Sequence, residues 1–399
     1  MNKERKGMQL VKQKRCNVFF MCALLVMMAV FVGYQSAESA TSERFGPSSP
    51  NENVSQQSEV VEQTQSPQSS QTPQTRFVLD SDGNKLEIPY YVTKAAPTAG
   101  AMSQMTQMLS QGEGKMSAAP IEYIYDYFKE LFPDYLISNA NNYDVASVED
   151  LIASGTQVTY GPGNFFSEDQ KQQLKSAGIV FVPINNLRTT KGICQAVSII
   201  GNILGDKSPQ RANEFISYYL SNMQNASTRI ASIAPENRLR VAKIRMMGDK
   251  YTTVNGRDIF TEYLDSAGGI NVAEGYNLQT ASSWVEVDVE QVIQWNPQII
   301  VTGDQQVKKS VLNDPALVVT DAVKNGKVYV IPCGLYLWSV RSGEGAMLPL
   351  WLGTILYPSE FSDIDMKKVV RDFFNEFYGY DISEKEIENV LAGGDVVPI

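Results

Sequence analysis

Two segments of the chain repeat one pattern, and this repeat constrains the fold more than any other feature. Residues 147–160 and 288–301 each begin with a polar residue, continue through an acidic residue and a short apolar stretch, and end in an apolar run before a glycine. The first part predicts a capped helix and the second a strand. A helix that feeds a strand is half of an α/β unit, and ligands of such sheets bind outside the carboxyl ends of the strands. Two units predict two α/β lobes that face one ligand.

The first 75 residues do not have the composition of a folded core. Six Lys and Arg residues precede an apolar run at 18–34, and small residues follow as far as Ala40. This pattern predicts an export signal at 1–40 that is either cleaved or kept as a membrane anchor. Residues 41–75 are rich in Ser, Gln and Pro, so we expect a disordered tether. The globular part is therefore expected on the extracytoplasmic face of the cell membrane, either anchored or released.

The sequence of 399 residues contains no histidine, which excludes catalytic triads and zinc sites that depend on imidazole. It has no phosphate-binding glycine loop and no nucleophile motif, so we expect a binding protein and no enzyme. A hydrolase based on carboxylates would need two converging acids, for which Asp304 and Glu344 are the candidates. The net charge of −10 argues against nucleic acid as a partner. Outside the leader only Cys194 and Cys333 remain, too few for a disulfide framework.

Helices and strands alternate after the tether, which predicts mostly parallel sheets. A hairpin is expected at 77–89 and an amphipathic helix at 121–132. The longest helical pattern has Ser208 as its cap and Pro209 at its first position, and it stops at Pro235. We expect it to join two lobes as a rigid connector, and the alternative is a surface helix of one domain. The expected parts are an N-terminal lobe at 76–205, the connecting helix at 206–235 and a C-terminal lobe at 236–399.

Several pieces of the sequence occur in an order that is typical of one family. These pieces are residues 78–89, 148–152, 263–273, 289–301 and 323–332. In this order they resemble the periplasmic-binding-protein family of ABC importers for iron-siderophores, haem and cobalamin. The resemblance implies two Rossmann-like α/β lobes with mostly parallel sheets, joined by a single long backbone helix, with the ligand in a cleft between the lobes.

This resemblance also implies a function. We expect a monomer that captures a small-molecule metal chelate, with a ferric siderophore ahead of haem and cobalamin, and delivers it to an ABC permease dimer in the membrane. No cofactor of its own and no metal bound directly by side chains is expected. The competing interpretation is an extracellular ligand-sensing or adhesion module that uses the same fold without transport.

The chain departs from the family pattern at residues 94–108, where the first ligand loop is expected. Met102, Met105 and Met108 follow one another there at helical spacing. Thioethers can bind copper or haem iron, but a methionine stripe at this spacing more often faces a core. We expect the core stripe.

Aromatic faces and Arg side chains suit flat or bulky chelates. The loop after the last strand offers this mixture, and the resemblance places it at the cleft. Further candidates follow from strand ends in both lobes, although Arg245 could instead lie in a buried ion pair, Trp284 in the core, and the loop aromatics against their own lobe. The expected ligand contacts are Tyr160, Asn164, Arg245, Met247, Arg257, Trp284, Tyr336, Trp338 and Arg341.

Glu149 and Glu290 occupy equivalent positions in the two repeated segments. In the resembling family, one acidic residue on each lobe at these helix starts pairs with basic residues of the permease. We therefore expect both residues to dock the permease. The alternative is that each carboxylate only stabilises the positive end of its own helix.

Overall fold

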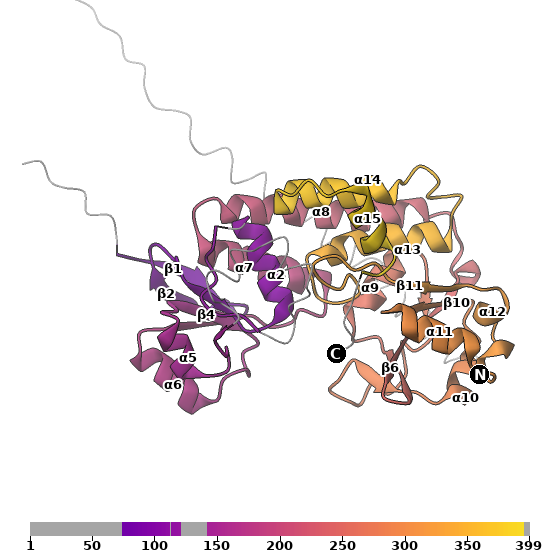
Figure 1. The fold of residues 1–399 in the computed structure, drawn as a ribbon, viewed down its shortest axis with the longest axis horizontal. Coiled ribbons are helices and arrows are strands. Elements are labelled where there is room, and N and C mark those ends of the chain that lie inside the picture. The colour runs from indigo at the N-terminus through magenta and orange to yellow at the C-terminus, as the bar shows by residue number, and fades with distance from the viewer. Residues whose placement is uncertain (1–73, 112, 121–141, 395–399) are drawn as a thin grey trace, which may run out of the picture. The chain divides into compact units, whose positions relative to one another are not determined.

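The computed structural model describes residues 74–111, 113–120 and 142–394, which belong to one compact unit (Figure 1). The predicted export signal and tether, and the helix predicted at 121–132, lie outside the described residues. The described part contains two α/β sheets and a separate hairpin. The hairpin pairs β1 (Thr75–Leu79) with β2 (Lys85–Pro89) in antiparallel register, as the Asp-Gly turn signal predicts.

The first sheet has three strands, and all of its pairs are parallel. Its strands, in spatial order, are β3 (Ala95–Pro97), β4 (Val158–Gly161) and β5 (Val180–Pro183). The helices that alternate with them are α5 (Val148–Ala153), α6 (Glu168–Ser176) and α7 (Thr190–Leu204). Each of these helices starts at a Ser or Thr whose side chain accepts a backbone N–H of the first turn, so local sequence defines where the helix begins.

The helix α2 (Gly100–Ser110) follows β3 directly, and every one of its residues is buried. Met102, Met105 and Met108 are at most 1% exposed and belong to the main apolar cluster. The prediction of a core stripe is therefore confirmed. Flexible thioether side chains suit a helix that is surrounded by other elements, because they fill irregular gaps.

The second sheet has six strands and is mixed. Its main path runs β11 (Val328–Val330), β10 (Ile299–Thr302), β6 (Arg240–Met247), β7 (Lys250–Val254) and β9 (Trp284–Glu286), and β8 (Ile270–Asn271) also pairs with β6. The pairs of β6 with β8 and β10, and of β10 with β11, are parallel as predicted. The antiparallel pairs of β7 with β6 and β9 were not expected. The two-lobed α/β fold class is confirmed, with a partly antiparallel second sheet.

The helices of the second half lie around this sheet and at the end of the chain. They are α9 (Ile259–Ser266), α10 (Val289–Trp295), α11 (Gln305–Asn313), α12 (Asp321–Lys324), α13 (Leu348–Leu356), α14 (Met366–Phe373) and α15 (Glu384–Leu391). The sequence repeat is realised as α5 followed by β4 and as α10 followed by β10. Both β4 and β10 are interior strands, each with a neighbouring strand on either side in its sheet.

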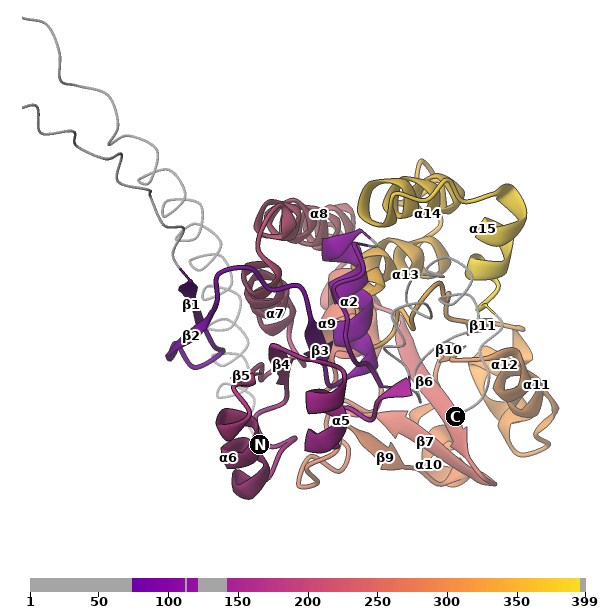
Figure 2. The same cartoon turned by 60° about the vertical axis from the view of Figure 1, so that its left-hand side comes forward.

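The helix α8 (Ser208–Arg229) packs against α2 and α7 of the first half and against α9 and α13 of the second (Figures 1 and 2). Its residues Phe215, Tyr219 and Ala226 are fully buried, and the Tyr219 hydroxyl donates to the Tyr263 hydroxyl on α9 at 2.8 Å. Because α8 contacts both halves, it is the connecting helix expected from the sequence. It ends at Arg229, earlier than the predicted stop at Pro235.

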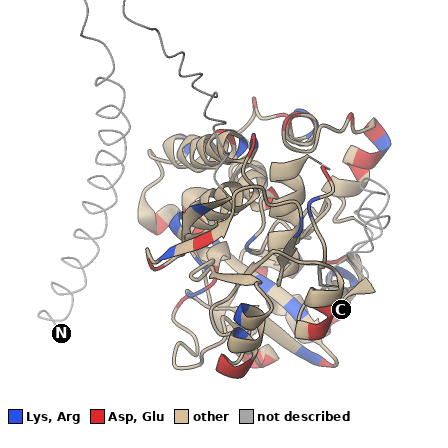
Figure 3. Cartoon of the chain, turned by 90° about the vertical axis from the view of Figure 1, so that its left-hand side faces the viewer, with Lys and Arg blue, Asp and Glu red and all other residues tan. Residues whose placement is uncertain are grey.

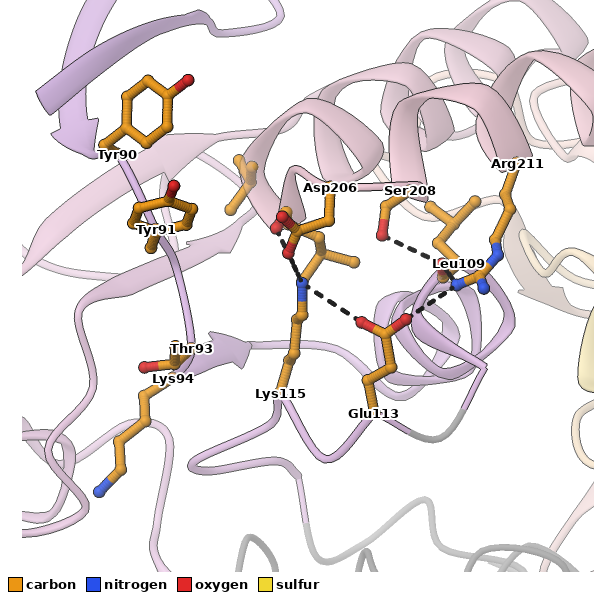
Figure 4. Close-up of polar contacts among 12 residues, drawn as sticks. Tyr90, Tyr91, Thr93, Lys94, Leu109, Glu113, Lys115, Asp206, Ser208 and Arg211 are labelled. Atoms are coloured by element: carbon orange, nitrogen blue, oxygen red, sulfur yellow. Dashed lines mark hydrogen bonds and ion pairs between the residues drawn. The ribbon is translucent and has the colours of Figure 1, made fainter. Parts of the chain in front are cut away.

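The start of α8 is fixed by tertiary contacts to the end of α2 (Figure 4). The Ser208 hydroxyl was expected to cap the helix, but it lies inside the first turn and donates to the Leu109 carbonyl at 3.1 Å. Arg211 donates to the same carbonyl at 3.0 Å. The buried Lys115 amine pairs with Asp206 at 2.7 Å and with Glu113 at 3.5 Å. The carbonyl of Leu109, near the end of α2, is thus satisfied by two donors from the first turn of α8.

Candidate functional site

The candidate site of the second half lies on one face of β6, β7 and β9. Lys243 and Arg245 are two residues apart on β6, so their side chains leave the same face of the sheet. Trp284 lies opposite Val254, on the same face of the sheet as Arg245 and two residue rows from the pair formed by Arg245 and Thr252. The Lys243 amine is 4.8 Å and the Arg245 guanidinium carbon 5.3 Å from the centroid of the Trp284 ring. Both cations are therefore in the distance range for attraction to the indole face. Figure 3 marks the basic positions on these strands.

Lys243 is almost completely buried, with 2% of its surface exposed. Its amine donates to the Ser339 carbonyl at 2.8 Å and lies 3.8 Å from a carboxylate oxygen of Asp258. Burial lowers the pKa of Lys243 to about 8; the charges of Arg245 and Arg341 act in the same direction and Asp258 opposes them. The amine is thus charged at neutral pH in a place that disfavours its charge.

The third cation is Arg341, whose charge acts on the Lys243 amine. It is exposed and follows Ser339, the acceptor of Lys243, by two residues in the loop after β11. Within the described residues, neither Arg245 nor Arg341 has a hydrogen bond from its guanidinium or an ion pair with a carboxylate. We call Lys243, Arg245 and Arg341 the basic cluster. A single described carboxylate, that of Asp258, opposes it.

The loop that carries Arg341 is held by a buried carboxylate, that of Glu344. The two carboxylate oxygens accept from the Trp338 indole N–H at 2.9 Å, the Tyr378 hydroxyl at 2.7 Å and the backbone N–H groups of Gly334 and Leu335 at 3.1 and 2.9 Å. Burial raises the pKa of Glu344 to about 7, and the hydrogen bonds oppose this rise. The buried Glu344 carboxylate therefore holds the loop in place, and the indole N–H of Trp338 is used in a hydrogen bond to it.

The same loop is packed against α2. The Gly343 N–H donates to the Gln104 side-chain oxygen at 2.9 Å, and the Gln104 amide donates to the Tyr378 hydroxyl at 2.5 Å. A Cβ atom at position 343 would lie 3.0 Å from the Met108 sulfur, so only glycine fits here without movement. Ala101, at the start of α2, packs against Tyr336. The first half of the molecule thus helps to position the loop of the basic cluster.

Residues 130–333, slightly more than half of the chain, match the family of periplasmic binding proteins. The chain belongs to this family. The resemblance inferred from the order of sequence signals is thereby confirmed. Members of this family are the substrate-binding proteins of ABC transporters and act outside the cytoplasm, so this is the functional class of the protein. Among the described residues no helix is long and apolar enough to cross a membrane.

Relatives of this periplasmic binding protein cover most of its length. The molybdate-binding protein MolA of Haemophilus influenzae is 27% identical over 337 residues, which cover 76% of this chain and 91% of MolA. A periplasmic solute-binding protein from Veillonella parvula has a TM-score of 0.68 at 22% identity and covers 80% of this chain and 97% of its own. The structure of MolA bound to molybdate has a TM-score of 0.62 at 20% identity and covers 77% and 99%. The structural likenesses show the two-lobed fold.

Two of the nine predicted ligand contacts, Arg245 and Trp284, lie with Lys243, and the charge of a third, Arg341, acts on the Lys243 amine. Lys243 was missed, although a signal for it exists. It stands in the apolar strand Val241–Ile244, and a lysine in a buried strand is rare unless it has a partner. The sequence pattern assigns Lys243 only to the strand and not to the site.

Three further predicted contacts are buried. Tyr160 and Trp338 have no exposed surface, and Tyr336 is 8% exposed. The Tyr160 hydroxyl lies 2.5 Å from that of Thr106 on α2, and burial raises the pKa of the phenol. These rings were expected to face a ligand because they follow or end strands. In this conformation they pack against α2 or bind Glu344 instead, and they leave a ligand little or no surface.

The remaining predicted contacts, Asn164, Met247 and Arg257, are exposed. Arg257 donates to the Thr280 carbonyl at 2.8 Å, and none of the three has a described contact with the basic cluster. The acids proposed for a hydrolase also have separate partners. Asp304 caps α11 by accepting from the Val307 N–H at 2.8 Å, whereas Glu344 is buried and holds its loop by hydrogen bonds.

Glu149 and Glu290 are exposed in the first turns of α5 and α10. The Ser147 hydroxyl donates to Glu149 at 3.3 Å, and no described side chain pairs with Glu290. Both carboxylates are therefore accessible at equivalent places in the repeat. Their role in docking the permease stays a prediction.

Proposed function

We propose that this substrate-binding protein captures a negatively charged metal compound and delivers it to a membrane permease. The observation that carries the proposal is the basic cluster, in which three cations are opposed by one described carboxylate. Lys243 is buried, and neither Arg245 nor Arg341 has a described acidic partner, so an anionic ligand would balance charge that the described carboxylates leave uncompensated. Ferric chelates, the class expected from the sequence, and metal oxyanions such as the molybdate bound by MolA both carry negative charge.

The arrangement of the chain supports capture between two lobes. We assign the lobes to residues 76–205 and 236–399 and the connector to 206–235. Because α8 packs against both halves as one unbroken helix, we expect only a small closing motion around the ligand. An exported chain with a tether at 41–75 would hold this unit outside the membrane, whether residues 1–40 are cleaved or remain as an anchor.

Native mass spectrometry and elemental analysis of the purified protein test the cargo. A bound metal compound supports the proposal directly. A parallel titration follows the tryptophan fluorescence, to which Trp284 contributes, with molybdate, a ferric siderophore, haem and cobalamin. Saturable quenching by one of these ligands is expected. The absence of any metal compound from the purified protein, together with no saturable response to any ligand, would refute the proposed cargo.

The permease is tested with Glu149→Ala and Glu290→Ala. Both carboxylates are exposed, so each variant should fold and keep its ligand affinity while uptake by whole cells falls. Glu168→Ala is the matched control, because Glu168 is also an exposed acid in the first turn of a helix of the first lobe. If both docking variants support normal uptake, the result favours the sensor interpretation and contradicts the importer role.

A further inference from the structure

The basic cluster has an excess of two positive charges over the described carboxylates around it. Asp258 is the one described acid within ion-pair distance of Lys243, at 3.8 Å. Its oxygens are already shared, because they accept from the Phe260 N–H at 3.1 Å and the Ser283 hydroxyl at 2.9 Å. Arg245 and Arg341 have no described acidic partner. A ligand with two negative charges would balance the cluster, and a ligand with one would not.

The aromatic surface around the cluster is limited. Tyr336 and Trp338 are 8% and 0% exposed, because the loop packs on α2 and on Glu344. Trp284 is half-buried, and its ring already lies within 5.3 Å of both β6 cations. Flat tetrapyrroles and aromatic chelates gain binding energy by stacking on open aromatic faces. The described residues therefore favour a ligand that is recognised through charge.

The donors of the cluster also match a small anion. The two guanidinium groups have forked N–H donors without described acceptors, and the Lys243 amine uses one of its protons on the Ser339 carbonyl. A tetrahedral oxyanion offers four acceptor oxygens within a small volume, and Arg forks bind such oxygens in pairs. On the basis of the proposed function, we infer that the cluster binds a small metal oxyanion with two negative charges, of the molybdate or tungstate type, and not a bulky chelate.

Calorimetric titration with three oxyanions separates charge from shape. Molybdate and tungstate are tetrahedral dianions at neutral pH, and perrhenate is a monoanion of the same shape. Molybdate and tungstate should bind, and perrhenate should bind at least about tenfold more weakly because half of the charge attraction is absent. Equal binding of all three ions would overturn the inference, since shape alone would then decide.

Arg341→Gln locates the site. Arg341 is exposed and has no described hydrogen bond or ion pair, so its loss should leave the thermal midpoint unchanged. Removing one charged donor should weaken molybdate binding about 10- to 100-fold. Lys309→Gln on α11 is the control, because it makes the same change in net charge at an exposed position outside the cluster. Unchanged molybdate affinity in Arg341→Gln would refute this assignment of the site.

The outcome of this experiment can be distinguished from that for the proposed function. If native mass spectrometry finds an organic metal chelate and molybdate does not bind, the oxyanion inference falls and the importer function stands. If no metal compound of any kind binds, the proposed function itself fails.

Discussion

The stability of the protein should depend on pH through Glu344, relative to a Glu344→Gln variant. The carboxylate is fully buried and accepts four hydrogen bonds, two of them from the side chains of Trp338 and Tyr378. Burial and hydrogen bonding act on it in opposite directions. Burial prevails, and the pKa of Glu344 rises from its ordinary value of 4.5 to about 7.

The direction and size of the pH effect on stability follow from the raised pKa of Glu344. Between pH 4.5 and about 7 the folded protein keeps a proton that the unfolded chain releases, so the free energy of unfolding decreases as the pH rises. One pKa unit is worth about 1.4 kcal/mol. The stabilisation from Glu344 is complete below pH 4.5, and about 3 kcal/mol of it is lost as the pH rises through 7.

Urea unfolding of both proteins at a series of pH values measures this difference. Other acids titrate in the same range, but they are common to both proteins, so subtracting the two curves isolates Glu344. The wild type should lose about 3 kcal/mol relative to Glu344→Gln between pH 4.5 and 8. Glu168→Gln, a change at an exposed carboxylate, is the control for the substitution itself. A flat or rising difference for Glu344→Gln would show that the four donors outweigh burial and keep the carboxylate ionised.

Two further predictions concern the first sheet and the basic cluster. Gly161→Ala would place a Cβ atom 1.7 Å from the Thr98 hydroxyl oxygen, so we expect the free energy of unfolding to fall by about 1–3 kcal/mol in denaturant titration. The double variant with Thr98→Ala should recover part of this loss. Full stability of the single variant would contradict the close approach. Lys243 has a pKa lowered to about 8 by burial, with Asp258 and the two arginines of the cluster as its charged neighbours. Molybdate affinity should therefore fall as the pH rises through 8, and Lys243→Met should remove this dependence; a wild-type affinity independent of pH would count against an anion at the amine.

Local periodicity was sufficient to predict most elements of the fold. The repeat of helix and strand is realised as α5 with β4 and α10 with β10, since capping residues and apolar runs specify each element within a few residues. The strand β3 was missed, because Ala95–Pro97 has neither β-branched nor aromatic residues and no alternation. The residue that precedes α2 at its N-cap position, Ala99, has no side chain that can cap the helix, so the beginning of α2 has no capping signal in the sequence.

The candidate site was predictable only in part, for a related reason. Aromatic and Arg residues at strand ends and in the last loop predicted Arg245, Trp284 and Arg341 as ligand contacts, because such side chains suit chelates, and their role stays a prediction. The direction of a side chain depends on tertiary packing, and this is why Tyr160 and Trp338 were expected to face a ligand although they are buried. Thr106, the partner of Tyr160, lies 54 residues away on α2, and Glu344 meets the indole of Trp338, six residues before it, only because of how the loop folds.

Glu344 also connects the two halves at the site. Tyr378 donates to Glu344 and accepts from Gln104 of α2, and Gln104 in turn accepts from the Gly343 N–H. Arg341 lies two residues before Gly343, so the position of its guanidinium depends on α2 in the first half and on the C-terminal helices in the second. A motion that separates α2 from this loop would break these hydrogen bonds and remove contacts that hold the loop of Arg341 in place. Under the proposed function, such a motion would loosen the anion site as it opens, and opening would then favour release of the ligand to the permease.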